Sequence, residues 1–148
     1  ITLTISLHAA SDFDRQKFMP IAKVYSIKDI VKAADYYYSS TGRRVSYEYA
    51  LTKISSKEES IDDLVKLLKG KPIHINLIRL NPVQEKEILG SDDKRADEIR
   101  KILEDNGISA TIRRSLGSDI EGSCGQLRNH FLSDEKKIRD FSEYSVIN

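Results

Sequence analysis

The single cysteine of this chain, Cys124, has neighbours that would suit a reactive thiol. It lies between Gly122 and Gly125, and glycine permits backbone angles that let other groups approach the sulfur closely. A thiolate is nucleophilic, whereas a structural cysteine usually behaves as a small buried hydrophobe and needs no such surroundings. Because most lone cysteines are buried and inert, both interpretations stay open on the cysteine alone.

Polar residues that could bind a ligand lie at the ends of two predicted strands. Residues 2–8 alternate strictly, which predicts a strand with Leu7 on its apolar face and Ser6 and His8 on its polar face. Asn81 follows the third predicted strand, directly before Pro82. Such groups suit an amino-acid carboxylate or a ribose. Ordinary strand polarity for Ser6 and His8, and a turn role for Asn81, are the alternatives.

Three arginines lie close to the cysteine in the sequence. Arg113 and Arg114 end the fourth predicted strand, and Arg128 follows Cys124. Contacts between such arginines and RNA phosphate would add salt-sensitive affinity. Solvated arginines, or arginines paired with carboxylates, are the commoner outcome.

Strand and helix patterns alternate along the chain. Strands are expected at 2–8, 44–51, 73–80 and 108–113, with helices between them and a polar loop at 52–57. This order predicts an α/β fold with a parallel sheet, in which the carboxyl ends of all strands meet at one edge. Three βα units cannot close a barrel. The polar faces of the first two strands would suit the interior of a barrel whose other half is missing.

The clearest helix signal lies between the first two strands. Ser26 and Asp29 have the spacing of a capping box, and Gly42 is a plausible end. One face of this helix is expected to carry Ile27, Ile30, Val31, Ala34 and Tyr38.

Length and composition fit one domain in a reducing compartment. The 148 residues are 39% hydrophobic, and 24 basic against 23 acidic residues give a net charge of +1, which excludes a polybasic arm or an acidic tail. One cysteine excludes an internal disulfide and an all-cysteine metal site, and it favours the cytoplasm. No apolar run approaches the roughly 20 residues needed to cross a bilayer. Because the sequence opens at Ile1 within a strand pattern, we expect a C-terminal part of a longer protein.

An ordered set of short motifs resembles one family. The motifs are Ser6-Leu7-His8-Ala9, Met19-Pro20-Ile21, Gly42-Arg43-Arg44-Val45, Ile75-Asn76-Leu77-Ile78 with Asn81-Pro82, and Cys124-Gly125-Gln126-Leu127. Together they closely resemble the C-terminal half of the radical SAM ribosomal RNA adenine methyltransferases, over about residues 2 to 130. The resemblance implies a partial (βα) radical SAM barrel: three C-terminal βα units, a further strand and a cysteine loop. It assigns residues 1–131 to that barrel domain and 132–148 to a polar tail.

The resemblance also implies a reaction and its cofactors. In this family an adenosine carbon, C2, of 23S rRNA and of some tRNAs is methylated through an S-methylcysteine intermediate, which corresponds here to Cys124. Ser6, Leu7, His8 and Asn81 correspond to positions that contact S-adenosylmethionine. A [4Fe-4S] cluster is bound by the N-terminal half of such proteins. The three-cysteine motif for that cluster and the second catalytic cysteine are absent here, so the chain alone is expected to be inactive and to hold no metal.

Alternatives remain within and outside this family. Arg79-Leu80-Asn81 is as similar to a sister group that methylates C8 of the same base as to the C2 group. The loop 53–57 departs from the family's usual Val-Asn-Asp. A non-catalytic α/β module that binds RNA or protein, and a degenerate paralogue, are the other interpretations.

Overall fold

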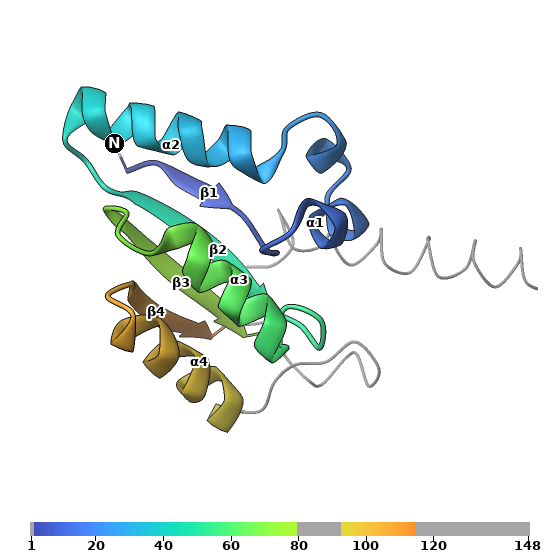
Figure 1. The fold of residues 1–148 in the computed structure, drawn as a ribbon. Coiled ribbons are helices and arrows are strands. Elements are labelled where there is room, and N and C mark those ends of the chain that lie inside the picture. The colour runs from blue at the N-terminus through green and yellow to red at the C-terminus, as the bar shows by residue number, and fades with distance from the viewer. Residues whose placement is uncertain (1, 80–92, 115–148) are drawn as a thin grey trace, which may run out of the picture. The chain divides into compact units, whose positions relative to one another are not determined.

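The computed structural model describes residues 2–79 and 93–114 (Figure 1). Its one sheet has the strand order β1 (Thr4–Ser6), β2 (Val45–Leu51), β3 (Ile73–Arg79) and β4 (Ser109–Arg114), and all neighbouring pairs are parallel. The predicted α/β architecture with a parallel sheet is therefore confirmed. The predicted boundary at residue 131 lies outside the described residues and stays a prediction.

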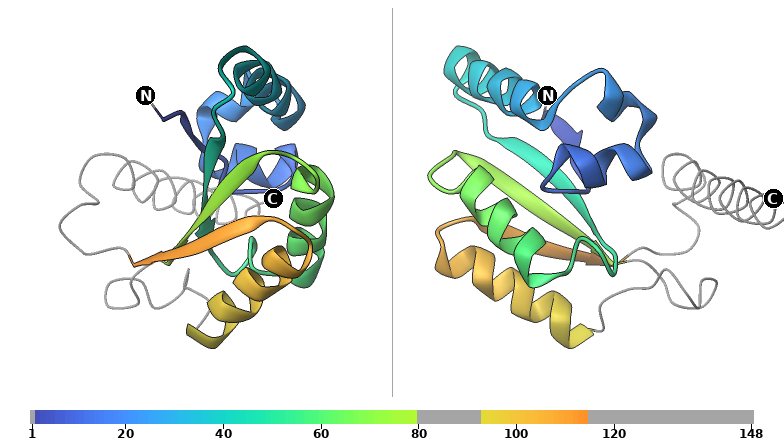
Figure 2. Two further views of the ribbon diagram at one scale, coloured as in Figure 1. Left: turned by 90° about the vertical axis from the view of Figure 1, so that its left-hand side faces the viewer. Right: turned by 45° about the vertical axis from the view of Figure 1, so that its right-hand side comes forward.

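The helices follow the order that the sequence predicted. They are α1 (Asp12–Phe18), the short 3-10 helix η1 (Pro20–Lys23), α2 (Ile27–Thr41), α3 (Glu58–Leu68) and α4 (Asp93–Asp105). Figure 2 shows α2, α3 and α4 on one side of the sheet, and the opposite face lies open in the described part of the chain. One layer of helices on one sheet face is the arrangement expected of a piece of a (βα) barrel.

Helix α2 begins and ends as predicted. The Ser26 hydroxyl accepts a hydrogen bond from the Asp29 amide at 3.1 Å, and the Asp29 carboxylate accepts one from the Ser26 amide at 3.3 Å, which completes the capping box. Gly42 ends the helix with φ +68° in the left-handed region, where glycine alone lacks a steric cost.

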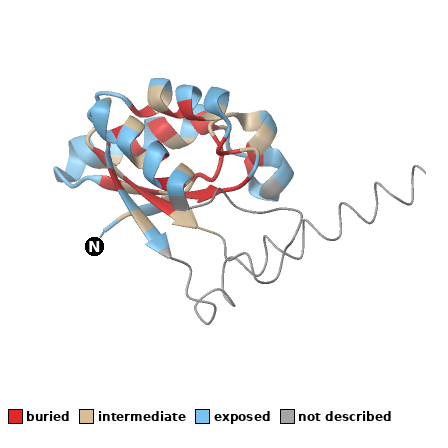
Figure 3. Cartoon of the chain, turned by 90° about the horizontal axis from the view of Figure 1, so that it is seen from below, coloured by how far each residue is buried: buried red, intermediate tan, exposed pale blue. Residues whose placement is uncertain are grey.

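The core lies between the helices and the apolar face of the sheet (Figure 3). Alternation along β2 is as predicted, because Val45, Tyr47, Tyr49 and Leu51 are fully or almost fully buried. The end of β1, strand β3 and strand β4 add Leu7, Ile75, Leu77 and Ala110, and helices α2, α3 and α4 contribute chiefly Val31, Ala34, Ile61, Leu64, Leu68, Ile99 and Leu103.

Strand register places the polar side chains of the sheet in rows on the open face. Thr4, Ser46, His74 and Ser109 form one row, and Ser6, Glu48, Asn76 and Thr111 form the next. Residues paired in register on parallel strands point to the same face. The polar face predicted from the first two strands thus continues across all four.

Two expectations about packing are wrong in detail. Tyr38, expected on the buried face of α2, is 39% exposed, and Tyr37 packs against the core instead. Tyr37 lies three residues after Ala34 and Tyr38 lies four, and both spacings place a side chain beside the buried face of a helix. The sequence pattern therefore could not tell which tyrosine is buried. The first strand is also shorter than predicted, since regular pairing covers Thr4–Ser6 and His8 leaves the extended conformation.

Candidate functional site at the strand ends

The carboxyl end of β1 holds three of the predicted ligand-binding residues. Ser6 is half-buried, whereas Leu7 and His8 are buried. The Leu7 side chain belongs to the hydrophobic core, so it cannot also present itself to a ligand. A ligand at this end would therefore meet the Ser6 hydroxyl, the His8 ring and the backbone.

His8 adopts an unusual backbone conformation. Its φ of +58° makes it the one non-glycine residue with positive φ among residues 2–79 and 93–114. The Leu7 and His8 amides both donate to the Glu48 carbonyl, at 2.9 and 3.2 Å, so the chain turns sharply as β1 ends. Such strain, typically about 1–3 kcal/mol, persists where surrounding contacts enforce it and is common at ligand sites.

The His8 ring is held in one protonation state. Its Nδ1 accepts a hydrogen bond from the Ala50 amide at 3.1 Å, so the neutral ring carries its proton on Nε2. Burial, and after it the charge of Arg15, lowers the pKa of His8 to about 4. At neutral pH His8 is thus an uncharged Nε2 hydrogen-bond donor at the edge where a ligand was predicted.

Arg15 of α1 is a residue of this site that the sequence did not reveal. It is 3% exposed, and its guanidinium donates to the carbonyls of Leu7 at 3.2 Å, Tyr25 at 3.3 Å and Ser6 at 3.4 Å. Desolvation lowers the pKa of Arg15, and nearby Asp12 partly opposes that effect. Because Arg15 lies among the charged residues Asp12, Asp14 and Lys17 of a short helix, its sequence context is that of a surface arginine.

Three residues of the loop after β2, Thr52, Ser55 and Ser56, are buried, whereas Lys53 and Lys57 are exposed. The Ser55 hydroxyl accepts from the Thr52 amide at 2.8 Å and donates to the Ala50 carbonyl at 2.6 Å. Arg95 of α4 donates to the Ser56 carbonyl at 2.9 and 3.2 Å. The Ser56 hydroxyl is buried without a hydrogen-bond partner in the described part of the chain. This loop, which departs from the family's usual sequence, is thus ordered by its own hydroxyls.

The open face of the sheet carries its own hydrogen-bonded chain. The His74 ring contacts the Ser109 hydroxyl at 2.7 Å and the Thr111 hydroxyl at 3.0 Å, and Thr111 donates to Asn76 Oδ1 at 2.9 Å. The alternation of residues 73–77, apolar at 73, 75 and 77, would have been the signal for His74 and Asn76. At the next row, Ser6 donates weakly to the Glu48 carboxylate at 3.4 Å.

Several predicted site residues are not described by the structure. Asn81, Cys124 and Arg128 lie outside the described residues, as does the side chain of Arg114. Arg113 is exposed. The structure thus brings together Ser6, Leu7 and His8, and the remaining assignments stay predictions.

No helix within residues 2–79 and 93–114 has the length and apolar character to cross a membrane. Nor do three side chains of the kinds that bind metal come together in that part of the chain.

Known proteins resemble this chain in structure. A crystallised radical SAM methyltransferase from Sphaerobacter thermophilus is 36% identical with a TM-score of 0.76, and the match covers 85% of this chain and 37% of that one. A domain of pyruvate-formate lyase-activating enzyme from Bacteroides vulgatus shares the fold alone, at 21% identity and a TM-score of 0.61. The chain is thus similar in fold and sequence to part of a radical SAM methyltransferase, and its parallel four-stranded sheet is consistent with part of a (βα) barrel.

The relatives found by sequence have names that state the substrate class, RNA. A probable dual-specificity RNA methyltransferase of Lachnoclostridium phytofermentans is 47% identical over 95% of this chain, and one of Alkaliphilus metalliredigens is 42% identical over 97%. No protein-family model matches the sequence. The resemblance is confirmed: the chain is homologous to part of the dual-specificity RNA methyltransferases. It spans about two fifths of their length, 39% and 41% in these two relatives.

Proposed function

We propose that this chain is the C-terminal barrel part of a radical SAM enzyme that methylates C2 of an adenosine in 23S rRNA, and in tRNA. The observation that carries the proposal is identity of 42–47% over more than nine tenths of the chain to curated RNA methyltransferases. The contacts at the end of β1 support it, because they prepare polar groups at the edge where ligands of parallel α/β proteins bind.

S-adenosylmethionine is the ligand that we assign to this edge. The neutral His8 ring offers an Nε2–H donor, and Ser6 offers a hydroxyl, so both can hydrogen-bond a carboxylate or a ribose. Leu7 would contribute its backbone, since its side chain is in the core. Asn81 completes the proposed set from the end of the third strand. When bound, the sulfonium group of this ligand supplies an electrophilic methyl.

Cys124 is the residue that we propose to carry the methyl group. Its thiolate would attack the methyl carbon, so that a sulfur–carbon bond forms on Cys124 while the bond to the sulfonium sulfur breaks and S-adenosylhomocysteine leaves. A sulfur carrier is chemically reasonable because a ring carbon of adenine is a poor nucleophile and a thiolate is a good one. Gly122 and Gly125 would give the loop the freedom to move between donor and base.

The iron–sulfur cluster implied by the family does not fit the residues of this chain. Clusters of this kind are held by several cysteine thiolates, and the sequence contains Cys124 alone. We therefore assign the cluster to the part of the relatives' length that this chain does not span. RNA is the proposed partner, with Arg113, Arg114 and Arg128 as candidate phosphate contacts, and the cytoplasm is the proposed location.

Mass spectrometry of Cys124 tests the proposal in a full-length protein that contains this chain. The peptide with Cys124 should carry one added methyl group, and Cys124→Ala should abolish RNA methylation. Ser123→Ala, which leaves the Cys124 thiol in place, should retain both the methyl group on Cys124 and the RNA methylation activity. Methylation of RNA by Cys124→Ala would contradict the carrier role.

The position of the methyl group separates C2 from C8 specificity. Digestion of the modified RNA to nucleosides should give 2-methyladenosine if the proposal holds. Formation of 8-methyladenosine would instead assign the chain to the sister group. An RNA that is bound but never modified by the full-length protein would favour a non-catalytic module or a degenerate paralogue.

A further inference from the structure

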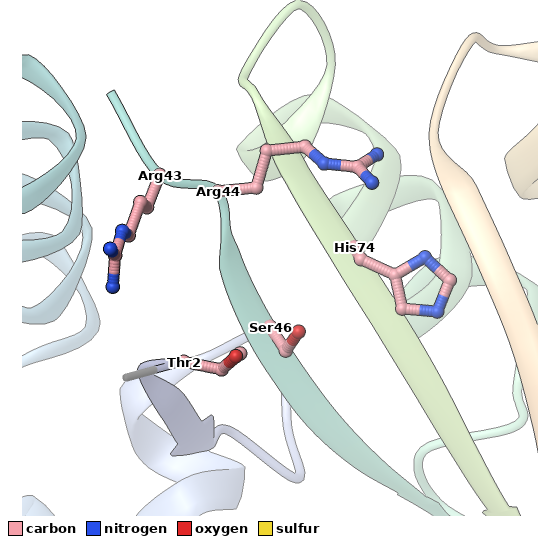
Figure 4. A pocket seen from close by; sticks show the side chains of 5 residues that line it. All are labelled: Thr2, Arg43, Arg44, Ser46 and His74. Atoms are coloured by element: carbon pink, nitrogen blue, oxygen red, sulfur yellow. The ribbon is translucent and has the colours of Figure 1, made fainter. Parts of the chain in front are cut away.

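The two ends of the strands differ in how deeply their basic residues are buried. At the amino ends, a hollow of about 560 Å³ has Thr2, Arg43, Arg44, Ser46 and His74 as its lining, and the first three of these are exposed (Figure 4). At the carboxyl end of β1, by contrast, Arg15 is 3% exposed. A charged side chain is rarely buried without a specific task for it, so the contacts of Arg15 indicate what that task is.

The guanidinium of Arg15 connects two segments of the chain. Its Nε and Nη2 donate to the Leu7 and Ser6 carbonyls, at 3.2 and 3.4 Å, and its Nη1 donates to the Tyr25 carbonyl at 3.3 Å. Ser6 and Leu7 directly precede His8, whereas Tyr25 lies just before helix α2. Because a guanidinium presents its donors in one rigid plane, it restrains the Ser6–Leu7 backbone relative to the start of α2.

Helix α1, which carries Arg15, is itself held in place at its first turn. The Asp12 carboxylate accepts a hydrogen bond from the Ile27 amide of α2 at 2.7 Å. The Ser11 hydroxyl caps α1 by accepting from the Asp14 amide at 3.2 Å. Arg15 therefore reaches the end of β1 from a helix whose position is fixed by other contacts.

The backbone that Arg15 restrains leads directly into His8. The φ of His8 is +58°, a strained conformation that surrounding contacts must enforce. Its Nδ1 accepts from the Ala50 amide at 3.1 Å, which leaves the proton of the neutral ring on Nε2. Within residues 2–79 and 93–114, Nε2 has no hydrogen-bond partner, although His8 is 5% exposed. A donor at such a buried residue is expected to meet a ligand or an ordered water.

We propose that Arg15 is a positioning residue for S-adenosylmethionine, because it holds the Ser6–Leu7 backbone so that the Ser6 hydroxyl and the His8 Nε2–H keep fixed places at the ligand edge. The inference rests on the proposed function and adds to it a buried residue that acts without touching the ligand. Donors that are fixed in advance lose little freedom on binding, so this restraint should raise the affinity. Burial, and after it the charge of Arg15, also lowers the pKa of His8 to about 4, which keeps the ring neutral.

Binding of S-adenosylhomocysteine to a full-length protein that contains this chain tests the inference by calorimetry. This probe lacks the transferable methyl group, so no methyl transfer accompanies binding. Arg15→Met should weaken the affinity about tenfold, because hydrogen bonds from displaced donors weaken steeply with distance and angle. Arg15→Lys keeps a cation and a donor and should recover part of that loss. Lys17→Met is the matched control on the same helix and should leave the affinity unchanged, since Lys17 pairs with Asp14 at the surface.

Two comparisons separate positioning from stability. Leu103→Ala removes a core side chain of α4, which packs on β3 and β4, so it should destabilise the protein about as much as Arg15→Met without weakening ligand binding. In a His8→Ala background, Arg15→Met should cause less than about a twofold further loss, because Arg15 acts through the turn that carries His8. Equal losses of affinity in Leu103→Ala and Arg15→Met, or the full effect of Arg15→Met in the His8→Ala protein, would overturn the inference. Arg15→Lys replaces Arg15→Met in both comparisons if the methionine variant does not fold.

Failure of the proposed function would give a different result. If the unaltered full-length protein does not bind S-adenosylhomocysteine, the ligand assigned to this edge is wrong and the inference is overturned with it. If that protein binds the probe and His8→Ala weakens binding, while neither Arg15 variant does, the ligand edge stands and the role of Arg15 alone is refuted.

Discussion

Arg15 brings a positive charge beneath the end of β1, where it serves in place of water as the partner of three backbone carbonyls. Carbonyl groups at the end of a strand have no partner within the sheet, so a buried strand end needs such a donor. The guanidinium presents several donors in a fixed plane, which suits this task better than the single ammonium of lysine. The strained turn at His8 is thus stabilised by the Arg15 guanidinium, which comes from the next helix, α1.

Replacement of Arg15 by methionine is expected to destabilise the chain. Arg15→Met keeps most of the side-chain volume but leaves the buried Leu7 carbonyl and the partly buried Ser6 and Tyr25 carbonyls without that donor, at a cost of about 2–4 kcal/mol. Chemical denaturation measures the free energy of unfolding. Arg100→Met should cost less than about 1 kcal/mol, because the exposed pairs of Arg100 with Asp97 and Glu104 contribute little. Equal losses in the two variants would refute a structural role for Arg15.

His8 should make the stability of the chain depend on pH. Burial lowers its folded-state pKa to about 4 from the ordinary 6.5, so the unfolded chain binds a proton at a higher pH than the folded chain does. Stability should therefore fall as the pH drops from about 6.5 toward 4, by up to about 3 kcal/mol. Urea unfolding at several pH values measures this effect.

His8→Gln is the matched variant for that measurement. It removes the titrating ring but leaves His74 and the carboxylates, so the difference between the two chains isolates His8. The variant should show a flatter dependence on pH between 6.5 and 4. Parallel curves for the two chains would mean that His8 titrates normally in the folded state.

At the scale of the elements, the loop after β2 is held by hydrogen bonds from its own side chains. The hydroxyls of Thr52 and Ser55 bond each other's backbone amides, at 3.1 and 2.8 Å, and the Tyr49 hydroxyl donates to the Ser55 carbonyl at 3.0 Å. Thr52 and Ser55 are both buried. Loops normally satisfy their backbone with water, so a buried loop needs internal donors and acceptors of this kind.

Ser55→Ala should therefore weaken this loop markedly. It removes the acceptor of the Thr52 amide and the donor to the Ala50 carbonyl, and leaving these two buried groups unpaired should cost about 2–3 kcal/mol. Hydrogen exchange should show faster exchange of the Thr52 amide. Ser39→Ala on the exposed side of α2, where the hydroxyl bonds only the Tyr36 carbonyl, should change stability by less than about 0.5 kcal/mol. Unaltered exchange at Thr52 would exclude the proposed role of the hydroxyl.

At the scale of the whole sheet, one face is covered by helices and the other is left open by residues 2–79 and 93–114. The helices and the apolar face of the sheet form the core, and polar rows from four strands occupy the other face. Since the chain spans about two fifths of its relatives' length, the remainder of those proteins could complete the barrel on this face. The proposed reaction would therefore require the part of the relatives' length that this chain does not span.

Reconstitution with iron and sulfide tests whether the 148-residue chain can hold an iron–sulfur cluster by itself. The 148-residue chain should retain no stoichiometric iron after desalting, because one cysteine cannot hold a [4Fe-4S] cluster. Cys124→Ala should give the same iron content as the unaltered chain. Stoichiometric iron that disappears in Cys124→Ala would show that the chain forms a metal site by itself.

The predicted and observed structures agree where the signal is local. The capping box of Ser26 and Asp29, the end of α2 at Gly42 and the alternation of β2 were all readable from neighbouring residues. Disagreements arose where local spacing was ambiguous, as for Tyr37 and Tyr38, or where contacts from elsewhere act on the backbone, as at His8.

By itself, the sequence determined the order of the elements, the ends of α2, the apolar face of the sheet and the family to which the chain is related. Short-range periodicity and capping carry that information. Only the tertiary structure revealed that Arg15 is buried and that His74 and Arg44 line one hollow. It also revealed that the His8 backbone has a positive φ and that burial lowers the pKa of its ring. These properties depend on contacts such as that between His8 and Ala50, 42 residues apart, which no local pattern encodes.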